Sequence, residues 1–518
     1  MRLAACVHRK SAPCCARVFA SRDYWQAGQA PKDPSPRLAM EPAAAGHRLE
    51  RDSLGGMHVP GDVLYGASTA RAVSNFPISG VPVPHRIVSA LASIKVAAAR
   101  ANRAHGALGD DVCDAICAAA ERVICDRDVL NAMNFPVDVF QTGSGTSSNM
   151  NVNEVIARLA STSLERAVHP NDDVNRAQSS NDCFPAAVRI AAAVTLRDDV
   201  LPALRLLEAS LRAKGTELWP VMHCARTHLQ DALPTRLGAL FIGHAAQVAV
   251  AIQRCEQAMQ QACGLSFGTA VGTAFGAPSA DFAQHMVDSL AEQTRLPLRN
   301  VTPTAQRFAA QACLDDALVV SQALSFTATA VTKSANDVRW LSTGPRAGLH
   351  EIDIPTVQPG SSMMPGKSNP VLCEALLQVC CAVLGGHSSL EHASLLLGST
   401  FELAAAWPLA GMVTVTHGQW LAAAVSKYAR DCVHGITPTD AGPQNAASSL
   451  MLATALAQDM GYDAAASVAK AAGSDRSTSL LEAALRTQEG QRMGETRLRA
   501  ILDPHAMLGP YDGPEPPK

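Results

Sequence analysis

The sequence predicts a mainly helical protein, and three observations support this prediction. Hydrophobic residues make up 47% of the 518 residues, whereas aromatic residues make up only 4%. The apolar residues gather in long alanine- and leucine-rich segments, a composition that favours helices over strands. One such segment places Leu204, Leu207 and Leu211 three to four residues apart, as on one face of a helix. We therefore expect long helices rather than a β-rich fold.

Charge and cysteine content argue against several classes of function. The formal charge of −3 gives no reason to expect nucleic acid or an anionic membrane surface as a partner. The fifteen cysteines show no paired metal-ligand spacing, so no metal site is expected. Cys14-Cys15 and Cys380-Cys381 are adjacent pairs that do not easily form separate disulfides. Reduced thiols in a reducing compartment are the simpler interpretation.

Residues 1–47 differ in composition from the rest of the chain. They mix Arg, Ala, Pro and Cys, and the first acidic residue is Asp23. An Arg-rich, acid-poor start resembles a transit peptide, which would place the protein in the mitochondrial matrix. Alternatively, translation begins at Met40, and the cytoplasm is then the expected compartment.

No transmembrane span is expected. The most apolar piece, Leu403–Thr416, is too short to cross a membrane and contains Pro408 and Gly411. We predict that it is a buried core helix.

The first polar stretch that interrupts the helical pattern is Phe140–Val155. It follows a turn-rich region at 50–80 and a helical pattern at 85–132. Two glycines flank Ser144, and Thr146 follows, so the stretch forms a hydroxyl-rich turn that suits a carboxylate. An ordinary helix N-cap accounts for the same residues.

The second polar stretch, His169–Pro185, contains the run Ser179-Ser180-Asn181-Asp182 at the start of a long helical region. Helix N-termini bind anions, but polar residues there also serve as caps. Both interpretations stay open on these residues alone.

The third polar stretch is Arg226–Pro234, which follows a break near Pro220. His228 is predicted in a loop before a helix, for which Pro234 is a suitable first-turn residue. A single loop histidine is usually a surface residue, so this stretch alone does not define a site. A glycine-rich turn follows at Gly264–Pro278, too loose for a phosphate-binding loop.

The fourth polar stretch, Pro359–Glu374, contains the widest range of side chains that can take part in catalysis. Long helical patterns at 306–342 and 371–427 flank it, and Pro438 begins a smaller C-terminal region. Glycine, proline and asparagine indicate an ordered loop with three hydroxyls, one ammonium, one amide and, a turn later, one carboxylate. Fixed donors around a hydroxyl stabilise developing negative charge. A polar connector between helices is the alternative.

The fourth stretch resembles the signature loop of the class II fumarase/aspartase superfamily, GSSxMPxKxNP. It reads here as Gly360–Pro370, with Ser368 where valine is usual. Tyr65–Thr69 resembles the YGAQT segment of the same superfamily. All four polar stretches match the superfamily in order and spacing, and the resemblance runs from about Glu50 to about Met507.

The resemblance implies a fumarase/aspartase-like fold of three largely helical domains with a central bundle of long helices. After an N-terminal extension at 1–47, the expected domains are 48–178, 179–437 and 438–518. The resemblance also implies a homotetramer with a helical core, in which each active site takes loops from three subunits. No cofactor, metal, nucleic acid or membrane partner is implied.

The resemblance assigns roles residue by residue. Ser361 would be the base that takes a proton from the carbon next to a carboxylate, with Lys367 stabilising the charge that develops. His228 would handle the leaving hydroxyl through water, polarised by Glu374. The residues expected to hold the substrate carboxylates are Ser144, Thr146, Ser179, Ser180, Asn181, Thr227, Lys367 and Asn369. A second, non-catalytic dicarboxylate site would use Arg166, His169, Asn171 and Asp172.

Two features favour a fumarase over an aspartase. The first polar stretch has Ser144 where aspartases tend to have alanine, and the second begins His169-Pro170-Asn171-Asp172, the fumarase form. The chain also departs from the superfamily pattern at 237–241, at 274–276 and at Ala404, which replaces an asparagine. Fumarate hydratase is therefore the predicted activity. An ammonia-lyase acting on aspartate, another C4-dicarboxylate lyase, and a catalytically weak homologue with a binding or structural role are the alternatives.

Overall fold

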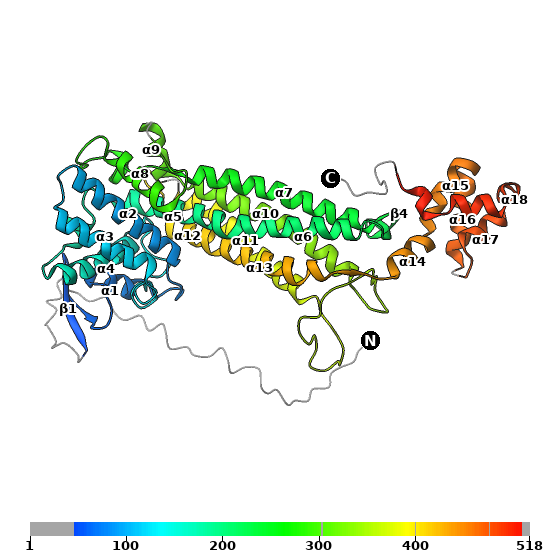
Figure 1. Ribbon diagram of the computed structural model, residues 1–518, viewed down its shortest axis with the longest axis horizontal. Coiled ribbons are helices and arrows are strands. Elements are labelled where there is room, and N and C mark those ends of the chain that lie inside the picture. The colour runs from blue at the N-terminus through cyan, green and yellow to red at the C-terminus, as the bar shows by residue number, and fades with distance from the viewer. Residues whose placement is uncertain (1–45, 302–303, 399, 476, 510–518) are drawn as a thin grey trace, which may run out of the picture. The chain divides into compact units, whose positions relative to one another are not determined.

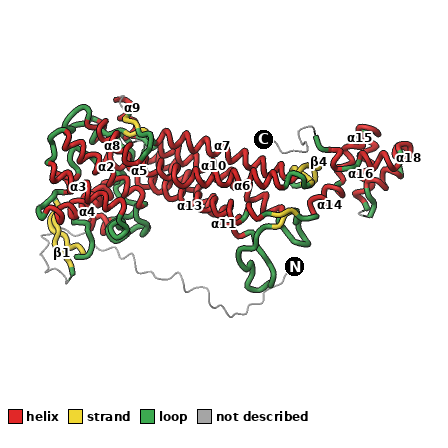
Figure 2. Tube along the Cα trace, in the orientation of Figure 1, coloured by secondary structure: helices red, strands yellow, loops and turns green. Residues whose placement is uncertain are grey.

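The computed structural model of the protein describes residues 46–301, 304–398, 400–475 and 477–509. The described residues belong to one unit, which begins at Gly46. The predicted extension at 1–47 therefore lies almost wholly outside the described residues. Over these residues the fold is mainly helical, as predicted, and the strands form two-stranded sheets (Figure 2).

The N-terminal part of the fold is a group of helices beside a β-hairpin. Its elements are β1 (His47–Asp52), β2 (Gly55–Pro60), α1 (Ala67–Asn75), α2 (His85–Ala104), α3 (Asp110–Cys125), α4 (Thr146–Leu164) and the short π-helix η1 (Pro170–Val174). The helical pattern predicted at 85–132 is thus two helices, and it ends earlier, at Cys125. α2 packs on α3 and α5, and its central residues are buried on every side. Its alanines permit this, because they add no bulk where helices approach closely.

Long helices form the central bundle (Figure 1). The bundle contains α5 (Ser180–Thr195), η2 (Leu196–Val200), α6 (Leu201–Glu217), α7 (Leu237–Ala262), α10 (Asp315–Leu341), α11 (Val371–Leu397), α12 (Trp407–Gly411), η4 (Met412–Thr416) and α13 (His417–Asp431). Helices α6, α7, α10, α11 and α13 close a ring in which each packs on the next, and α10 also contacts α13 across the ring. The buried residues of α10 recur every three to four positions, as expected of near-parallel helix packing. Leu204, Leu207 and Leu211 are buried on α6, as their spacing predicts.

Short elements connect the long helices. They are β3 (Met222–Thr227), β4 (Gln230–Arg236), β5 (Gly264–Leu265), η3 (Ala270–Gly272), α8 (Phe282–Thr294), β6 (Arg299–Asn300), α9 (Thr304–Ala312), β7 (Ile352–Asp353), η5 (Val433–Gly435) and β8 (Thr437–Pro438). The helical pattern predicted at 306–342 is therefore divided between α9 and α10, and the one at 371–427 between α11 and the helices after 407.

The prediction that Pro234 opens a helix is wrong. Pro234 lies within β4, where it pairs with Cys224 of β3, and the helix begins three residues later at Leu237. Proline lacks an N–H, but a two-stranded hairpin has only edge strands and leaves room for it. His228 is therefore placed in a hairpin turn rather than in a loop that leads directly into a helix.

The C-terminal part has a small core of its own. Its elements are α14 (Ala441–Ser448), η6 (Leu450–Leu452), α15 (Ala453–Met460), α16 (Tyr462–Ser474), α17 (Leu480–Leu485), α18 (Gln488–Met493), α19 (Glu495–Ile501) and η7 (Pro504–Met507). Leu456, Val468 and Leu498 lie at the centre of this core. The predicted domain limits fall at the start of α5 and within β8, and the division into three domains stays a prediction.

α11 is a longer apolar segment than any that we expected from the sequence. Among the described residues, α11 is the one helix long and apolar enough to cross a membrane by length and composition alone, with a mean hydropathy of 1.5. In the bundle it packs against α10 and α13. Only 28% of its most apolar 18-residue stretch is buried, so much of this helix is exposed in a single chain. The segment Leu403–Thr416, by contrast, is mostly buried, as predicted.

Candidate active site

The first group of predicted residues lies where α4 and α5 begin. The hydroxyl oxygen of Thr146 lies 2.8 Å from that of Ser144 and 2.7 Å from that of Ser180. Thr146 is the first residue of α4 and Ser180 the first of α5, so two helix N-termini meet at this chain of hydroxyls. Helix N-termini carry partial positive charge and unpaired N–H groups. The arrangement is therefore suited to binding a carboxylate group.

Two glycines allow this loop to pack closely. Gly145 caps α4 with a φ of 71°, and a Cβ there would lie 2.1 Å from the ring of Phe184 on α5. A Cβ on Gly143 would lie 2.0 Å from the carbonyl oxygen of Ala405. Any side chain at either position would push the loop away from α5 or from the segment that precedes α12.

Ser179 and Asp182 cap α5. The Ser179 hydroxyl accepts a hydrogen bond from the Asn181 amide at 3.2 Å, and the Ser179 amide donates to Asp182 at 3.1 Å. The second Asp182 oxygen accepts from the amides of Gly268 and Thr269, at 3.1 and 2.6 Å. Burial raises the pKa of Asp182, and these hydrogen bonds oppose that rise. Asp182 thereby fixes the predicted glycine-rich turn against α5. Ser179 caps α5, and its role toward substrate stays a prediction.

Sequence reasoning missed Lys95, which is fully buried on α2 behind this cluster. Its ammonium donates to side-chain oxygens of Asn149 at 2.8 Å and of Asn175 and Gln178 at 3.0 Å. Burial lowers the pKa of Lys95. Asn149 lies one turn after Thr146, so the charge is held close to the hydroxyls. A lysine inside an apolar alanine-rich run was the available sequence signal.

The second group includes His228, at the tip of the β3–β4 hairpin. Thr227 pairs with Gln230, which leaves His228 and Leu229 as a two-residue turn with φ of 56° and 61°. Positive φ at both central residues is the pattern of a type I′ hairpin turn. Thr227 and His228 are exposed. His228 borders a cavity of about 850 Å³ that Lys333 of α10 also lines.

Ser361 lies in the loop before α11, and its hydroxyl oxygen accepts two backbone hydrogen bonds. The donors are the amides of Met363, at 3.2 Å, and Met364, at 2.9 Å. Two N–H groups directed at one oxygen stabilise negative charge on it. The predicted fixed donors around a hydroxyl are therefore present at Ser361.

The base of this loop is closed by its own residues. The Gly360 amide donates to the carbonyl of Lys367 at 3.0 Å, and the Asn369 side chain donates to the carbonyl of Gly360 at 2.7 Å. A Cβ on Gly360 would lie 2.3 Å from the Lys367 carbonyl oxygen, so glycine is required there. The Lys367 side chain is exposed, as is Glu374 in the first turn of α11. The roles of Lys367, Asn369 and Glu374 toward substrate stay predictions.

The group of hydroxyl residues around Ser180 and the hairpin with His228 lie at opposite ends of the bundle within one chain. At one end, Asp182 of α5 contacts Gly268 and Thr269, just beyond the end of α7, whereas the hairpin with His228 precedes the start of α7. Since α7 has 26 residues, it spans about 39 Å at 1.5 Å per residue. A site that contains both groups must therefore combine parts of different copies of the chain.

The second predicted dicarboxylate site is less well formed. Arg166 makes an ion pair with Asp111 at 2.6 Å, and His169 caps η1 by accepting from the amides of Asn171 and Asp172. The four predicted residues are close in sequence and mostly exposed, and Arg166 already has an anionic partner. This site stays a prediction.

Comparisons with known proteins identify the family. The lyase family matches residues 55–385. The class II fumarate hydratase of Chromobacterium violaceum is 42% identical over 446 residues, which cover 85% of this chain and 95% of that protein. The chain belongs to the class II fumarate hydratase family. The family member of Mycobacterium tuberculosis is 40% identical over 472 residues, covering 91% and 98% of the two chains.

Solved structures agree with this family assignment. The crystal structure of the recombinant class II fumarase from Schistosoma mansoni superposes with a TM-score of 0.83 at 34% identity, covering 89% of this chain and 99% of that one. The predicted fumarase/aspartase-like fold is confirmed. In the part of the chain that the structure describes, no three His, Cys, Asp or Glu side chains form a group that could hold a metal ion.

Two of the three departures from the family pattern lie in different environments. Leu240, within the altered 237–241 run, lines the same cavity as His228. Ala404 is buried, and its amide donates to the carbonyl of Gln311 at 3.0 Å. The buried Oε1 of Gln311 has no hydrogen-bond partner among the described residues. Ala404 therefore lies where the segment before α12 meets α9.

Proposed function

We propose that this chain is a fumarate hydratase, which interconverts L-malate and fumarate by trans elimination and addition of water. Membership of the class II family supports this proposal. The observation that carries it is that the Ser361 hydroxyl oxygen accepts hydrogen bonds from two backbone amides. A serine is a poor base unless its alkoxide is stabilised, and these amides supply that stabilisation.

The proposed reaction begins with proton transfer to Ser361. The alkoxide takes the proton from the carbon next to one malate carboxylate, and the electron pair moves into that carboxylate to form the aci-carboxylate. Lys367, on the same loop, would balance the added charge. The hydroxyls of Ser144, Thr146 and Ser180 would hold the other carboxylate, with the ammonium of Lys95 behind them.

The second step expels the hydroxyl group. His228 would deliver a proton through a water molecule, with Glu374 polarising the ring, so that the hydroxyl leaves as water. The electron pair returns from the aci-carboxylate to form the carbon–carbon double bond of fumarate. The proton on Ser361 is then released to solvent and His228 takes one up, so that atoms and charge balance over the cycle.

We propose that the active protein is a homotetramer whose sites are shared between subunits. The separation of the Ser180 and His228 groups by the length of α7 supports sharing. The exposed face of α11 supports assembly, since Leu384, Leu395 and Leu396 are 39%, 74% and 73% exposed in a single chain.

We also propose the cytoplasm as the location, or the mitochondrial matrix if residues 1–47 act as a transit segment. Sequencing the N-terminus of the protein purified from its native cells would decide between them. An N-terminus near residue 47 would favour the matrix.

An ultraviolet assay tests the proposed reaction. Purified protein should produce fumarate absorbance from L-malate and none from L-aspartate. Ser361→Ala should lower turnover by orders of magnitude, and Ser362→Ala on the same loop is the matched control that should keep most of it. Fumarate from aspartate alone would identify an ammonia-lyase, and no product from either substrate would contradict the proposal.

Mixing two inactive variants tests the shared site. Ser361→Ala and His228→Asn proteins should each be nearly inactive, but after joint unfolding and refolding the hybrids should regain activity, because some sites then take both residues from intact copies. No recovery in folded hybrids would contradict sharing between these two residues.

A further inference from the structure

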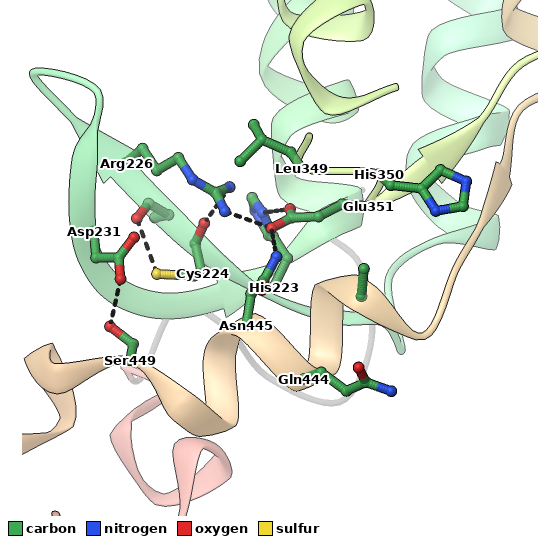
Figure 3. A network of polar contacts seen from close by, with 12 residues as sticks. His223, Cys224, Arg226, Asp231, Leu349, His350, Glu351, Gln444, Asn445 and Ser449 are labelled. Atoms are coloured by element: carbon green, nitrogen blue, oxygen red, sulfur yellow. Dashed lines mark hydrogen bonds and ion pairs between the residues drawn. The ribbon is translucent and has the colours of Figure 1, made fainter. Parts of the chain in front are cut away.

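A buried carboxylate, Glu351, joins three separate elements near the His228 hairpin. Its Oε1 accepts from the guanidinium of Arg226 at 2.6 Å and from the Asn445 amide at 3.0 Å, and its Oε2 lies 3.2 Å from His223 Nδ1 (Figure 3). His223 and Arg226 belong to β3, and Asn445 belongs to α14. The Glu351 amide also donates to the carbonyl of Leu341, at the end of α10. Glu351 thus connects the hairpin to the bundle and to the C-terminal part.

The charge on Glu351 is held firmly. Its side chain is fully buried, which would raise its pKa, but hydrogen bonds from His223, Arg226 and Asn445 lower that pKa to about 2. The carboxylate is therefore ionised at neutral pH. Removing a partner from a buried ion pair leaves the other charge uncompensated, so the contact with Arg226 resists opening.

The hairpin needs an anchor because its tip is strained. His228 and Leu229 both have positive φ, a conformation that costs non-glycine residues about 1–3 kcal/mol each. Their side chains are exposed and pack against little. The rest of the hairpin must therefore hold the turn, and Arg226 lies only two residues before His228.

The opposite strand of the hairpin is tied to the same C-terminal segment. The Ser449 hydroxyl donates to Asp231 of β4 at 3.3 Å (Figure 3). α14 packs on β3, and η6 packs on β4. Both strands that lead to His228 are thus fixed by residues 441–452 and by Glu351.

We propose that Glu351 is a positioning residue, which holds the His228 hairpin in its working geometry through Arg226 and couples it to α14. This inference rests on the proposed role of His228. Glu351 is fully buried, and its side chain contacts His223, Arg226 and Asn445. It therefore acts through the hairpin rather than on substrate. Its loss should therefore affect proton delivery to the leaving group more than binding of the carboxylates.

Steady-state kinetics provide the first test. Glu351→Gln should lower kcat on the order of 100-fold, the effect of misplacing a catalytic group by about 1 Å, while KM for malate stays unchanged. Glu154→Gln is the matched control. It removes another buried carboxylate, whose partners are Gly66, Ser68 and Thr69 rather than the hairpin. An unchanged kcat in Glu351→Gln, or an equal loss in Glu154→Gln, would overturn the proposal.

A double-mutant cycle tests whether Glu351 acts through His228. In a His228→Asn background, adding Glu351→Gln should cause little further loss of kcat, because the group that it positions is already absent. Additive losses would overturn the proposal while leaving the fumarate hydratase assignment intact. Full activity in His228→Asn alone would instead refute the role of His228.

Hydrogen exchange tests the anchor independently of any reaction. Amide exchange across Met222–Arg236 should be faster in Glu351→Gln than in the wild-type protein or in Glu154→Gln. If Glu351→Gln does not fold, Asn445→Ala removes one of the three contacts and should give the same changes to a smaller degree. Unaltered exchange in the hairpin of folded variants would overturn the proposal even if the protein proved inactive on malate.

Discussion

Replacing Gly145 with alanine should destabilise the protein and disorder the hydroxyl cluster. The left-handed conformation at Gly145, with φ 71° and ψ 19°, costs an alanine about 1–2 kcal/mol. The new Cβ would also lie 2.1–2.4 Å from three ring atoms of Phe184. Relieving such overpacking typically costs a further 1–3 kcal/mol, roughly. The expected loss in free energy of unfolding is therefore about 2–5 kcal/mol.

Gly106→Ala is the matched control for this experiment. Gly106 has a similar φ of 69°, but a Cβ there meets no atom within 4 Å. Denaturant unfolding of both variants at equal protein concentration separates the cost of the left-handed backbone from the cost of the steric clash with Phe184. Both costs apply to Gly145→Ala, but only the first applies to Gly106→Ala. Because Ser144 and Thr146 must move with the loop, Gly145→Ala should also raise KM for malate. Equal stability of the two variants would refute the reasoning that Phe184 fixes this loop.

Two further predictions follow from buried and exposed groups. The pKa of Glu351 is lowered to about 2 from an ordinary 4.5, so its contribution of about 3 kcal/mol is present above pH 4.5 and lost as the pH falls toward 2. Acid unfolding measured from pH 7 to pH 2 should show a smaller loss of stability in Glu351→Gln, and parallel curves for the two proteins would contradict this assignment. Cys125 and Cys381 are both exposed in a single chain, but Cys381 lies on α11. Mass spectrometry after maleimide treatment of the assembled protein should find Cys125 labelled and Cys381 protected, and equal labelling would argue against burial of α11 between subunits.

Helix positions were predictable from sequence where the pattern of apolar residues decides the structure. The spacing of Leu204, Leu207 and Leu211 required a helix face, and the serines before α4 and α5 indicated helix starts. Pro234 misled the prediction, because proline suits the first turn of a helix and an edge strand equally well. The pairing of β3 with β4 decided between them, and that pairing is a tertiary contact.

The parts of the site that sequence reasoning missed depend on long-range contacts. Lys95 and Glu351 are both buried charged residues, and the local sequence signals burial only for Lys95, through the alanine-rich run around it. Their partners, such as Asn175 for Lys95 and Arg226 for Glu351, are 80 and 125 residues away. The separation of Ser180 from His228 likewise depends on the direction and length of α7, which no short motif records.

The lengths of α7 and α10 restrict how this chain can vary. These helices determine how far the Ser180 end of the bundle lies from the His228 end, and the packed bundle fixes their rotation about their own axes. One inserted residue would lengthen α7 by about 1.5 Å and rotate the hairpin by about 100° relative to the rest of the bundle. Substitutions on the exposed faces carry no such geometric cost. Insertions and deletions should therefore accumulate in the connecting loops, whereas α7 and α10 keep a constant number of residues even as their sequences diverge.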